Sequence, residues 1–557
     1  MKKLIKFDSN IAEKILDGAI NTAKIVGTTL GPVGSNVIIS NNGFTRFTKD
    51  GISVLRAISF EDQYENVAAE LIREASDKTN SESGDGTTGT ALLAAAIYQN
   101  GLKHTAVGAN KIHVRNGILK AANFLADYLK TISTPISTRD EIRKIANISS
   151  NHSDEIADVL ADIFDKIGQN GTIKVETGNT TTIESKIVDG MQFNSGYISP
   201  YFVTNEKMEA DLDNPFVMIV DKKISNIQEI VKAMAAISKL GRPVLLICDN
   251  LEGDALSTVV LNKIRGSIQI CAVKCPSYGQ NRKNMLQDIA ILTGGQVVSE
   301  ETGIPIDKAM PETGIIGTAK RVIVTRETTT IIGGNGSSEK IAERIEQLKT
   351  EIAASKDEYD LKKMRERLAK LDGGVGIISV GAKTESELLE KKDLVDDAFC
   401  ACKAAIKDGV VAGGGIALLQ CKNALMNYIR SDTLSNDKIF STDEFIGARA
   451  LLDSLDIPFK TILMNAGESA ELILAKMQEK IQINTTAINT PCYDVLEKEF
   501  FDSSLEHGLI DPTGVIISEI LNSASVAGLL LTTTASIISI PDEKDIAAQN
   551  QQLAMQM

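Results

Sequence analysis

The hydrophobic pattern of this chain changes twice along its 557 residues. The first 130 or so residues carry mostly helical periodicity, and short β-rich runs alternate with helices from about 170 to 330. Helical periodicity returns after Gly373-Gly374, and the length favours about three to four domains. The pattern therefore predicts that both chain ends build one domain, into which an α/β domain is inserted.

Local signals place the first elements. Asp8-Ser9-Asn10 is a helix cap, and Gly31-Pro32 is a stop signal for the helix that follows it. A strand pair is expected at Val37–Ser40 and Thr45–Thr48, joined by an Asn42-Gly43 turn. Further helices are expected at about 65–80, 88–99 and 106–129, the last interrupted near Gly108.

The middle of the chain favours strands. They are expected at Thr172–Glu176, Thr182–Val188, Phe216–Val220, Val244–Cys248, Gln269–Val273, Val322–Thr325 and Ile377–Val380. Two amphipathic helices on either side of Ser355-Lys356-Asp357 predict a helical hairpin. The polar tail 542–557 is expected to be disordered.

Composition argues against several classes of protein. The net charge of −14 disfavours a nucleic-acid binder, which needs a basic face. The seven cysteines are scattered, odd in number and without nearby His, so reduced thiols are favoured over disulfides or a metal site. The N-terminus has no signal-peptide core, and apolar runs such as 91–97 are too short to cross a bilayer, so we expect a soluble cytoplasmic protein.

The loop Gly84-Asp85-Gly86-Thr87-Thr88 carries the first chemical signal. Its glycines let backbone N–H groups approach an anion, and the helix that it opens favours negative charge at its N-terminus. Asp85 would repel a phosphate unless a cation lay between them. The loop is typical of a magnesium-phosphate site, although it is not a Walker loop, and a plain glycine-rich helix cap also explains it.

Distant segments add to this signal. Thr28-Thr29-Leu30-Gly31-Pro32 and Thr48-Lys49-Asp50-Gly51 are further tight turns. Val395-Asp396-Asp397 offers a carboxylate to orient or deprotonate water, and Gly413-Gly414-Gly415 allows close approach of a nucleotide. Asp511-Pro512-Thr513 begins another helix, where an ordinary cap is the alternative explanation.

Taken together, the motifs resemble one known family. TTLGP, TKDG, GDGTT, GYISPYF, DKKISNI, QDIAILTGG, VVAGGG and LIDPT occur in the order and spacing of the group I, GroEL-like chaperonins, from Phe7 to about Ile540. The resemblance implies a multidomain α+β fold with a mostly helical equatorial domain (1–131 and 409–557), a small intermediate domain (132–188 and 376–408) and an inserted α/β apical domain (189–375). It also implies a homo-oligomeric ring of seven subunits that acts on unfolded polypeptides.

The resemblance further implies a slow ATPase that uses ATP, Mg²⁺ and K⁺. Asp85 resembles the magnesium ligand, Asp397 the aspartate that activates the attacking water, and Asp50 its helper. The potassium shell maps to Thr29, Lys49 and Thr88, and the ribose-binding carboxylate to Asp511. The other implied ATP-site residues are Leu30, Gly31, Pro32, Gly51, Gly86, Thr87, Ile148, Ser149, Gly414 and Gly415.

Nine positions resemble the family's binding surface for unfolded chains. They are Tyr197, Ser199, Tyr201, Phe202, Val231, Met234, Leu256, Val260 and Leu261. Their helical spacing by itself favours core packing, whereas the resemblance implies that they face the cavity of the ring. Deformable aliphatic and Met side chains suit promiscuous binding of apolar segments.

The sequence also departs from the family pattern. Gly89 replaces a third threonine, and Ser195 replaces an arginine that would pair with Glu385 across subunits. At the ring–ring contact Lys460 is present, but Ser469 replaces its acidic partner, and about nine extra residues lie around Ser431–Ser441. These changes predict weaker coupling within a ring and a weakened or absent double ring.

Other departures concern the base and the tail. Tyr493-Asp494-Val495 replaces a Tyr-Asn-Ala contact to adenine, and Gly-Gly-Met tail repeats are missing. Such features are typical of a divergent chaperonin, for example one carried by a bacteriophage. Two alternatives to a foldase stay open: a ring scaffold without productive ATPase cycling, and an unrelated phosphotransferase. The acids Asp50, Asp85 and Asp397 argue against the first, and the missing Walker motif argues against the second. Whether a co-chaperonin lid is needed does not follow from the chain.

Overall fold

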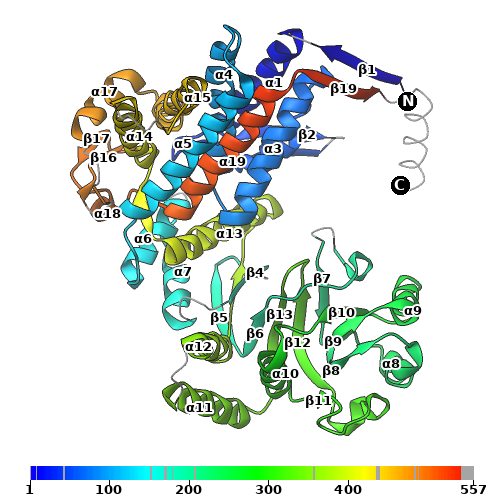
Figure 1. Ribbon diagram of the computed structural model, residues 1–557. Helices are drawn as coiled ribbons and strands as arrows, with labels where there is room; N and C mark the ends of the chain where they lie inside the picture. Colours follow the sequence, from blue (N-terminus) through cyan, green and yellow to red (C-terminus); the bar gives the residue numbers. More distant parts are fainter. Residues whose placement is uncertain are drawn as a thin grey trace. The chain divides into compact units, whose positions relative to one another are not determined.

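The computed structural model describes residues 2–7, 9–41, 44–150, 153–167, 172–178, 180–205, 208–354, 358–434, 439–481, 485–486 and 489–540 (Figure 1). The predicted Asn42-Gly43 turn, the Ser355–Asp357 connection and the polar tail lie outside these residues.

The chain forms two compact units. The first consists of 1–161 and 382–557, and the second of 162–381. In this division one unit is inserted into another that is built from both chain ends, which is the layout that the sequence favours. The proposed intermediate domain is divided between the two units, so the three-domain boundaries stay a prediction.

The first unit is mostly helical. Its helices are α1 (Ser9–Gly27), α2 (Gly51–Ala57), α3 (Gln63–Ser83), α4 (Thr87–Thr105), α5 (Lys111–Ile132), α6 (Arg139–Ser149), α13 (Glu385–Asp408), α14 (Ile416–Leu434), α15 (Thr442–Leu452), α16 (Ile457–Asn465), α17 (Ala470–Lys480), α18 (Ser504–His507) and α19 (Thr513–Thr532). A further helix, α7 (Asp154–Ile167), runs from the first unit into the second. The first helix ends at Gly27 rather than at Gly31, because Thr29 turns back and donates from its backbone N and its Oγ1 to the Val26 carbonyl.

Helix α19 lies in the core of the first unit. Figure 1 shows it, in red, alongside α3 and α4, and it also packs against α5. Among the described residues it is the one helix long and apolar enough to cross a membrane, but 61% of its apolar stretch is buried in the protein. It is therefore a core helix, and its apolar residues join the cluster that contains Ile72, Leu93 and Ile118.

Short strand pairs complete the first unit. They are β1 (Lys2–Phe7) with β19 (Ala535–Ile540), β2 (Val37–Asn41) with β3 (Phe44–Thr48), β15 (Val410–Ala412) with β18 (Ile510–Pro512), and β16 (Cys492–Asp494) with β17 (Glu499–Phe501), all antiparallel. The β2–β3 pair was predicted. The β1–β19 pair, which joins the two ends of the chain, was not.

The second unit is an α/β unit, as predicted. Its main sheet has the order β10-β9-β8-β12-β13-β6, with β11 added to β8 and β7 to β12. The strands of this sheet are β6 (Gly190–Phe193), β7 (Ala210–Asp213), β8 (Phe216–Ile224), β9 (Val244–Leu251), β10 (Ile270–Lys274), β11 (Val297–Val298), β12 (Gly317–Val324) and β13 (Thr329–Gly334). A smaller sheet has the order β4-β14-β5, formed by β4 (Thr172–Thr177), β14 (Val375–Val380) and β5 (Glu184–Val188).

Helices and short 3-10 turns accompany the main sheet. They are η1 (Pro200–Phe202), η2 (Ile227–Glu229), α8 (Val231–Lys239), α9 (Gly253–Ile264), α10 (Gly279–Thr293), η3 (Ile306–Lys308), η4 (Pro311–Thr313), α11 (Ser338–Ala354) and α12 (Glu358–Asp372). The predicted hairpin is confirmed, because α11 packs against α12. Both of these helices are tied to α10 by the buried Asp288, which accepts from Arg344 Nε at 2.9 Å and Arg367 Nε at 2.7 Å.

Candidate functional site

The loop between α3 and α4 is shaped by two glycines with positive φ. Gly84 (φ 75°) ends α3, and Gly86 (φ 87°) precedes α4. A Cβ at Gly84 would collide with the side chain of Cys400, so only glycine lets α13 approach this closely. Between the two glycines, the Asp85 Oδ1 accepts from the Gly86 N–H at 2.6 Å.

A second turn contacts this loop. Asp50 caps α2, where its carboxylate accepts from the N–H groups of Ile52 at 3.1 Å and Ser53 at 3.0 Å. A Cβ at Gly51 would collide with the hydroxyl of Thr88 and lie 2.7 Å from that of Thr87. The predicted GDGTT and TKDG segments are therefore neighbours in space, with the hydroxyls of two threonines between them.

Asp397 belongs to the same group of acids. Burial raises the pKa of its carboxyl well above its ordinary value, and the charges of Asp85 and Asp50 raise it further. The pKa of Asp85 is also raised, by desolvation and by the charge of Asp50, although Asp85 is exposed and a hydrogen bond from Gly86 opposes the shift. Asp397 is therefore close enough to Asp85 and Asp50 for their charges to act on it, as the sequence predicted.

The C-terminal half of the chain supplies the glycine turn and Asp511. Strands β15 and β18 pair, and Gly413 N–H donates to the Leu509 carbonyl at 2.9 Å. The N–H of Gly414 donates to the Asp511 carboxylate. Burial and the charge of Asp85 nevertheless raise the pKa of Asp511 to about 7. Asp511 is thus a member of the acidic group and not merely a helix cap.

Glu519 is a site residue that sequence reasoning missed. It lies on α19, is 7% exposed, and its pKa is raised well above the ordinary value by burial and by the charges of Asp511 and Asp85. A Cβ at Gly86 would lie 2.9 Å from its Oε1. The available signal was that Glu519 is the single charged residue of the helix.

Five carboxylates thus gather beside the glycine and threonine turns: Asp50, Asp85, Asp397, Asp511 and Glu519. In the part of the chain that the structure describes, none of them is ion-paired with Lys or Arg. Oxygen ligands of this kind are what Mg²⁺ prefers, and a cation would relieve their mutual repulsion. The chemistry of these oxygens therefore suits a magnesium ion, although among the described residues no three of these carboxylates lie within 4.8 Å of one another.

The remaining predicted ATP-site positions belong to the same unit as this group. Helix α16 packs its Ile462 against Gly31 and its Phe459 against Gly415. On the same helix, Asn465 donates to the carbonyls of Gly27 and Leu30 at 2.9 Å, which fixes the TTLGP turn. The hydroxyl of Thr29 lies in that turn, whereas Lys49 is exposed beside Asp50, and their shared potassium shell with Thr88 stays a prediction.

Ile148 and Ser149 end α6, which packs against α13 and β18. The helix is held there by Lys144, whose Nζ donates to the carbonyls of Leu505 and Glu506. This places the two predicted nucleotide contacts beside the helix that carries Asp397 and the strand that carries Asp511.

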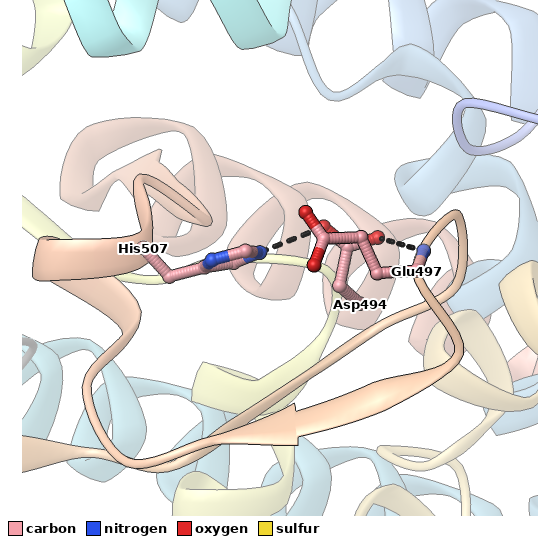
Figure 2. A group of neighbouring side chains, drawn as sticks. All are labelled: Asp494, Glu497 and His507. Carbon is pink, nitrogen blue, oxygen red and sulfur yellow. Dashed lines mark hydrogen bonds and ion pairs between the residues drawn. The ribbon is translucent and has the colours of Figure 1, made fainter.

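The altered adenine-contact segment has its own local structure. Figure 2 shows Asp494, on β16, facing His507, and His507 Nε2 lies 2.7 Å from Asp494 Oδ2. Asp494 Oδ1 accepts from the N–H of Leu496 at 2.7 Å, and the His507 ring stacks on Phe501. Burial would raise the pKa of Asp494, but the hydrogen bonds from His507, Leu496 and Glu497 outweigh it and lower that pKa. The carboxylate of Asp494 is therefore engaged by His507 and by the backbone N–H groups of the turn that follows β16.

The second unit carries the predicted binding surface for unfolded chains. Tyr201 (65% exposed), Val231 (39%) and Leu261 (46%) present their side chains to solvent. Tyr197, Leu256 and Val260 are half-buried. Two exposed side chains near the ends of α8 and α9, Leu240 and Ile264, were not predicted.

For three members of this surface, the prediction that the side chain is exposed is wrong. Phe202 is fully buried, and Met234 is 9% exposed, because both pack into the core of the second unit. Ser199 is buried because its hydroxyl caps η1 by accepting from the Tyr201 N–H. Tyr201 is held outward by Lys263 of α9, whose Nζ donates to the carbonyls of Tyr201 and Val203 at 2.7 Å.

The residues of the predicted ring contacts are engaged within the chain. Lys460 Nζ lies 3.3 Å from Asp456 Oδ2 and 3.0 Å from Glu471 Oε1. Ser195 accepts a hydrogen bond from Thr329 through its backbone carbonyl. The side chain of Glu385 and residues 435–438 of the extra segment lie outside the description.

Comparisons with known proteins agree with the fold. A model of the TCP-1/cpn60 chaperonin family matches residues 22–541. Among solved structures, the chain is similar to the chaperonin gp146 from the bacteriophage EL (Pseudomonas aeruginosa), crystallised in the presence of ATP-BeFx. The TM-score is 0.70 and the sequence identity 20%, over 97% of this chain and 100% of that one. The GroEL-like multidomain fold is confirmed.

Proposed function

This chain belongs to the TCP-1/cpn60 chaperonin family, and we propose that it is an ATP-hydrolysing subunit of a homo-oligomeric ring that captures and folds unfolded polypeptides. Members of the family are chaperonins, so a role in protein folding follows from membership. The proposal adds the ATPase cycle, the ions, the client surface and the form of the ring.

One observation carries the proposal. Acids from both ends of the chain, Asp50 and Asp85 from the first part and Asp397 and Asp511 from the last, gather at turns rich in Gly and Thr. Such a group of carboxylates without Lys or Arg partners lowers the stability of the fold, and groups of this kind are typical of functional sites. Beside backbone N–H groups at a helix N-terminus, it suits a nucleotide whose phosphates bring a cation.

The chemistry follows from these positions. Mg²⁺ bound with ATP supplies charge neutralisation at the phosphates, and Asp85 would hold it. The N-terminus of α4 and the hydroxyls of Thr87 and Thr88 would orient the phosphates. Asp397 would take the proton of the attacking water, with Asp50 orienting that water.

The other predicted residues hold the rest of the nucleotide. Asp511 would accept from ribose hydroxyls, and Gly414 and Gly415 leave room for the nucleotide to approach. The contacts of Ile148, Ser149 and the Thr29–Pro32 turn, and K⁺ held by Thr29, Lys49 and Thr88, complete the proposed site. Positioning and electrostatics are sufficient for slow hydrolysis, which would time the folding cycle.

The client surface is proposed on η1, α8 and α9. Its exposed members are Tyr201, Val231 and Leu261, and Leu240 and Ile264 are exposed at the C-terminal ends of α8 and α9. Exposed apolar side chains on neighbouring elements suit the capture of unfolded segments of varied sequence. Phe202 and Met234 support this surface from the core.

Exposed apolar strands support assembly into a ring. Ile5, Phe7 and Ile537 on the β1–β19 pair, and Ile38 and Phe47 on the β2–β3 pair, are 54 to 66% exposed. Such side chains on strand edges are typical of subunit contacts. We propose a ring of seven subunits in the cytoplasm, which for a virus-encoded protein is that of the host.

Refolding of a denatured client tests the proposal. The wild type with ATP should raise the yield of active client above that of spontaneous refolding, and Asp397→Ala should capture the client without raising the yield. Glu390→Ala, an exposed acid on the same helix, is the matched control and should behave as wild type. Capture by the wild type that is unaffected by ATP would favour the scaffold alternative instead.

A further inference from the structure

Glu519 is a carboxylate with an unusual environment. It is the single charged residue of α19, is 7% exposed, and accepts no hydrogen bond from any residue that the structure describes. Burying a carboxylate without a partner is expensive, so such a group normally has a ligand or a proton. The residues around Glu519 indicate whether it binds a ligand or a proton.

The carboxylate of Glu519 lies against the phosphate-facing loop. A Cβ added at Gly89 would lie 2.8 Å from Oε2 and collide with Oε1, and a Cβ at Gly86 would meet Oε1 at 2.9 Å. The carboxylate therefore fills the space into which any side chain at position 89 would project. Gly89 and Glu519 are a matched pair, because a larger residue at 89 requires the carboxylate to leave.

This position adds negative charge where phosphates would bind. Asp511 and Asp85 are the charged groups that act most strongly on Glu519. A carboxylate at the phosphate end repels the nucleotide unless a cation lies between them. The carboxylate can stay there only if the loop holds a cation or if Glu519 is neutral.

We propose that Glu519 is a cation-positioning residue, which together with Asp85 holds a divalent cation on the subunit before the nucleotide arrives. The inference rests on the proposed ATP site. It explains both the glycine at position 89 and the acid in the middle of an apolar core helix. The nucleotide would then enter a site that is already partly neutralised.

Titration of the full-length protein with Mn²⁺ alone, followed by its electron paramagnetic resonance signal, tests the proposal without any turnover. The wild type should bind Mn²⁺ in competition with Mg²⁺. Glu519→Gln, which keeps the shape and removes the charge, should weaken Mn²⁺ binding about 10- to 100-fold. Glu82→Gln, an exposed acid nearby on α3, should leave it unchanged.

A second variant covers the case in which Glu519→Gln does not fold. Glu519→Ala combined with Gly89→Ser refills the space with a neutral side chain and should show the same loss of Mn²⁺ binding. Unchanged Mn²⁺ affinity in either folded variant, or no Mn²⁺ binding by the wild type, would overturn the inference. Binding of a fluorescent ADP separates the two proposals: if ADP binds normally but Mn²⁺ affinity does not depend on Glu519, only this inference fails.

Discussion

At the scale of the residue, the ionised acids of the site lower the stability of the cation-free subunit. Burial and mutual repulsion raise the pKa values of Asp397, Asp511 and Glu519. An acid whose pKa is raised by folding stabilises the protein below its unfolded pKa, and this contribution is lost as the pH rises through the folded pKa. For Asp511 the loss extends from the ordinary value of 3.8 to about 7.

We predict that the cation-free protein loses stability as the pH rises from 3.8 to about 7, and that Asp511→Asn reduces this loss. Urea unfolding across this range measures it, and added Mg²⁺ should also reduce it. Asp494→Asn is the matched control, because the pKa of Asp494 is lowered. Its contribution is present at neutral pH and lost only as the pH falls below 3.8. An Asp511→Asn protein with the wild-type dependence on pH would contradict this account.

Residue identities explain why part of the site could be predicted. The Gly, Thr and Asp motifs predicted tight turns, because glycine allows positive φ and close approach, and the structure brings two of these turns together. Glu519 could not be found in this way, since helical periodicity does not say which distant loop a buried side chain faces. Phe202 was misplaced because resemblance transfers a position in the chain and not its exposure.

At the scale of the element, periodicity predicted helices that correspond to α1, α3, α4 and α5. Local signals also predicted the β2–β3 pair, whose partners are close in sequence. The β1–β19 pair was missed because its strands lie at opposite ends of the chain, and local signals do not encode such a pairing. The hairpin of α11 and α12 was predicted from two apolar stripes. What fixes it to α10 is polar: the buried group of Asp288, Arg344 and Arg367.

We predict that Asp288→Ala destabilises this hairpin strongly. Asp288 is fully buried, and its removal leaves the guanidinium groups of Arg344 and Arg367 buried without their carboxylate. Breaking such a group costs about 3–5 kcal/mol, whereas Glu366→Ala, which breaks a half-exposed pair with Lys363, should cost less than about 1 kcal/mol. Faster hydrogen exchange throughout α11 and α12 would report the effect. Protection equal to that of the Glu366 variant would show that the polar group does not hold the hairpin.

At the scale of the whole molecule, the nested layout places the proposed ATP site in one unit and the client surface in the other. The first unit closes on itself through β1–β19 and through α19, so both ends of the chain must fold before the site exists. This arrangement was predicted from the return of the helical pattern. The division of the chain into two units does not give the boundaries of a separate intermediate domain.

We predict that the particle is a single ring. Lys460 is engaged by Asp456 and Glu471 of its own chain, and Ser469 offers no carboxylate to a second ring. Native mass spectrometry should give the mass of one ring both with and without ATP. Two-ring particles that persist under both conditions would show that another contact has replaced this pair.

The central claim is that acids from both ends of the chain form one ATPase site. Release of inorganic phosphate by the wild type and by Asp397→Ala, at saturating ATP with Mg²⁺ and K⁺, tests it most directly. The account predicts slow hydrolysis by the wild type and a kcat about 10²- to 10⁴-fold lower in Asp397→Ala, with fluorescent ADP bound equally by both. Hydrolysis at the wild-type rate by Asp397→Ala, or no hydrolysis by the wild type, would contradict the account.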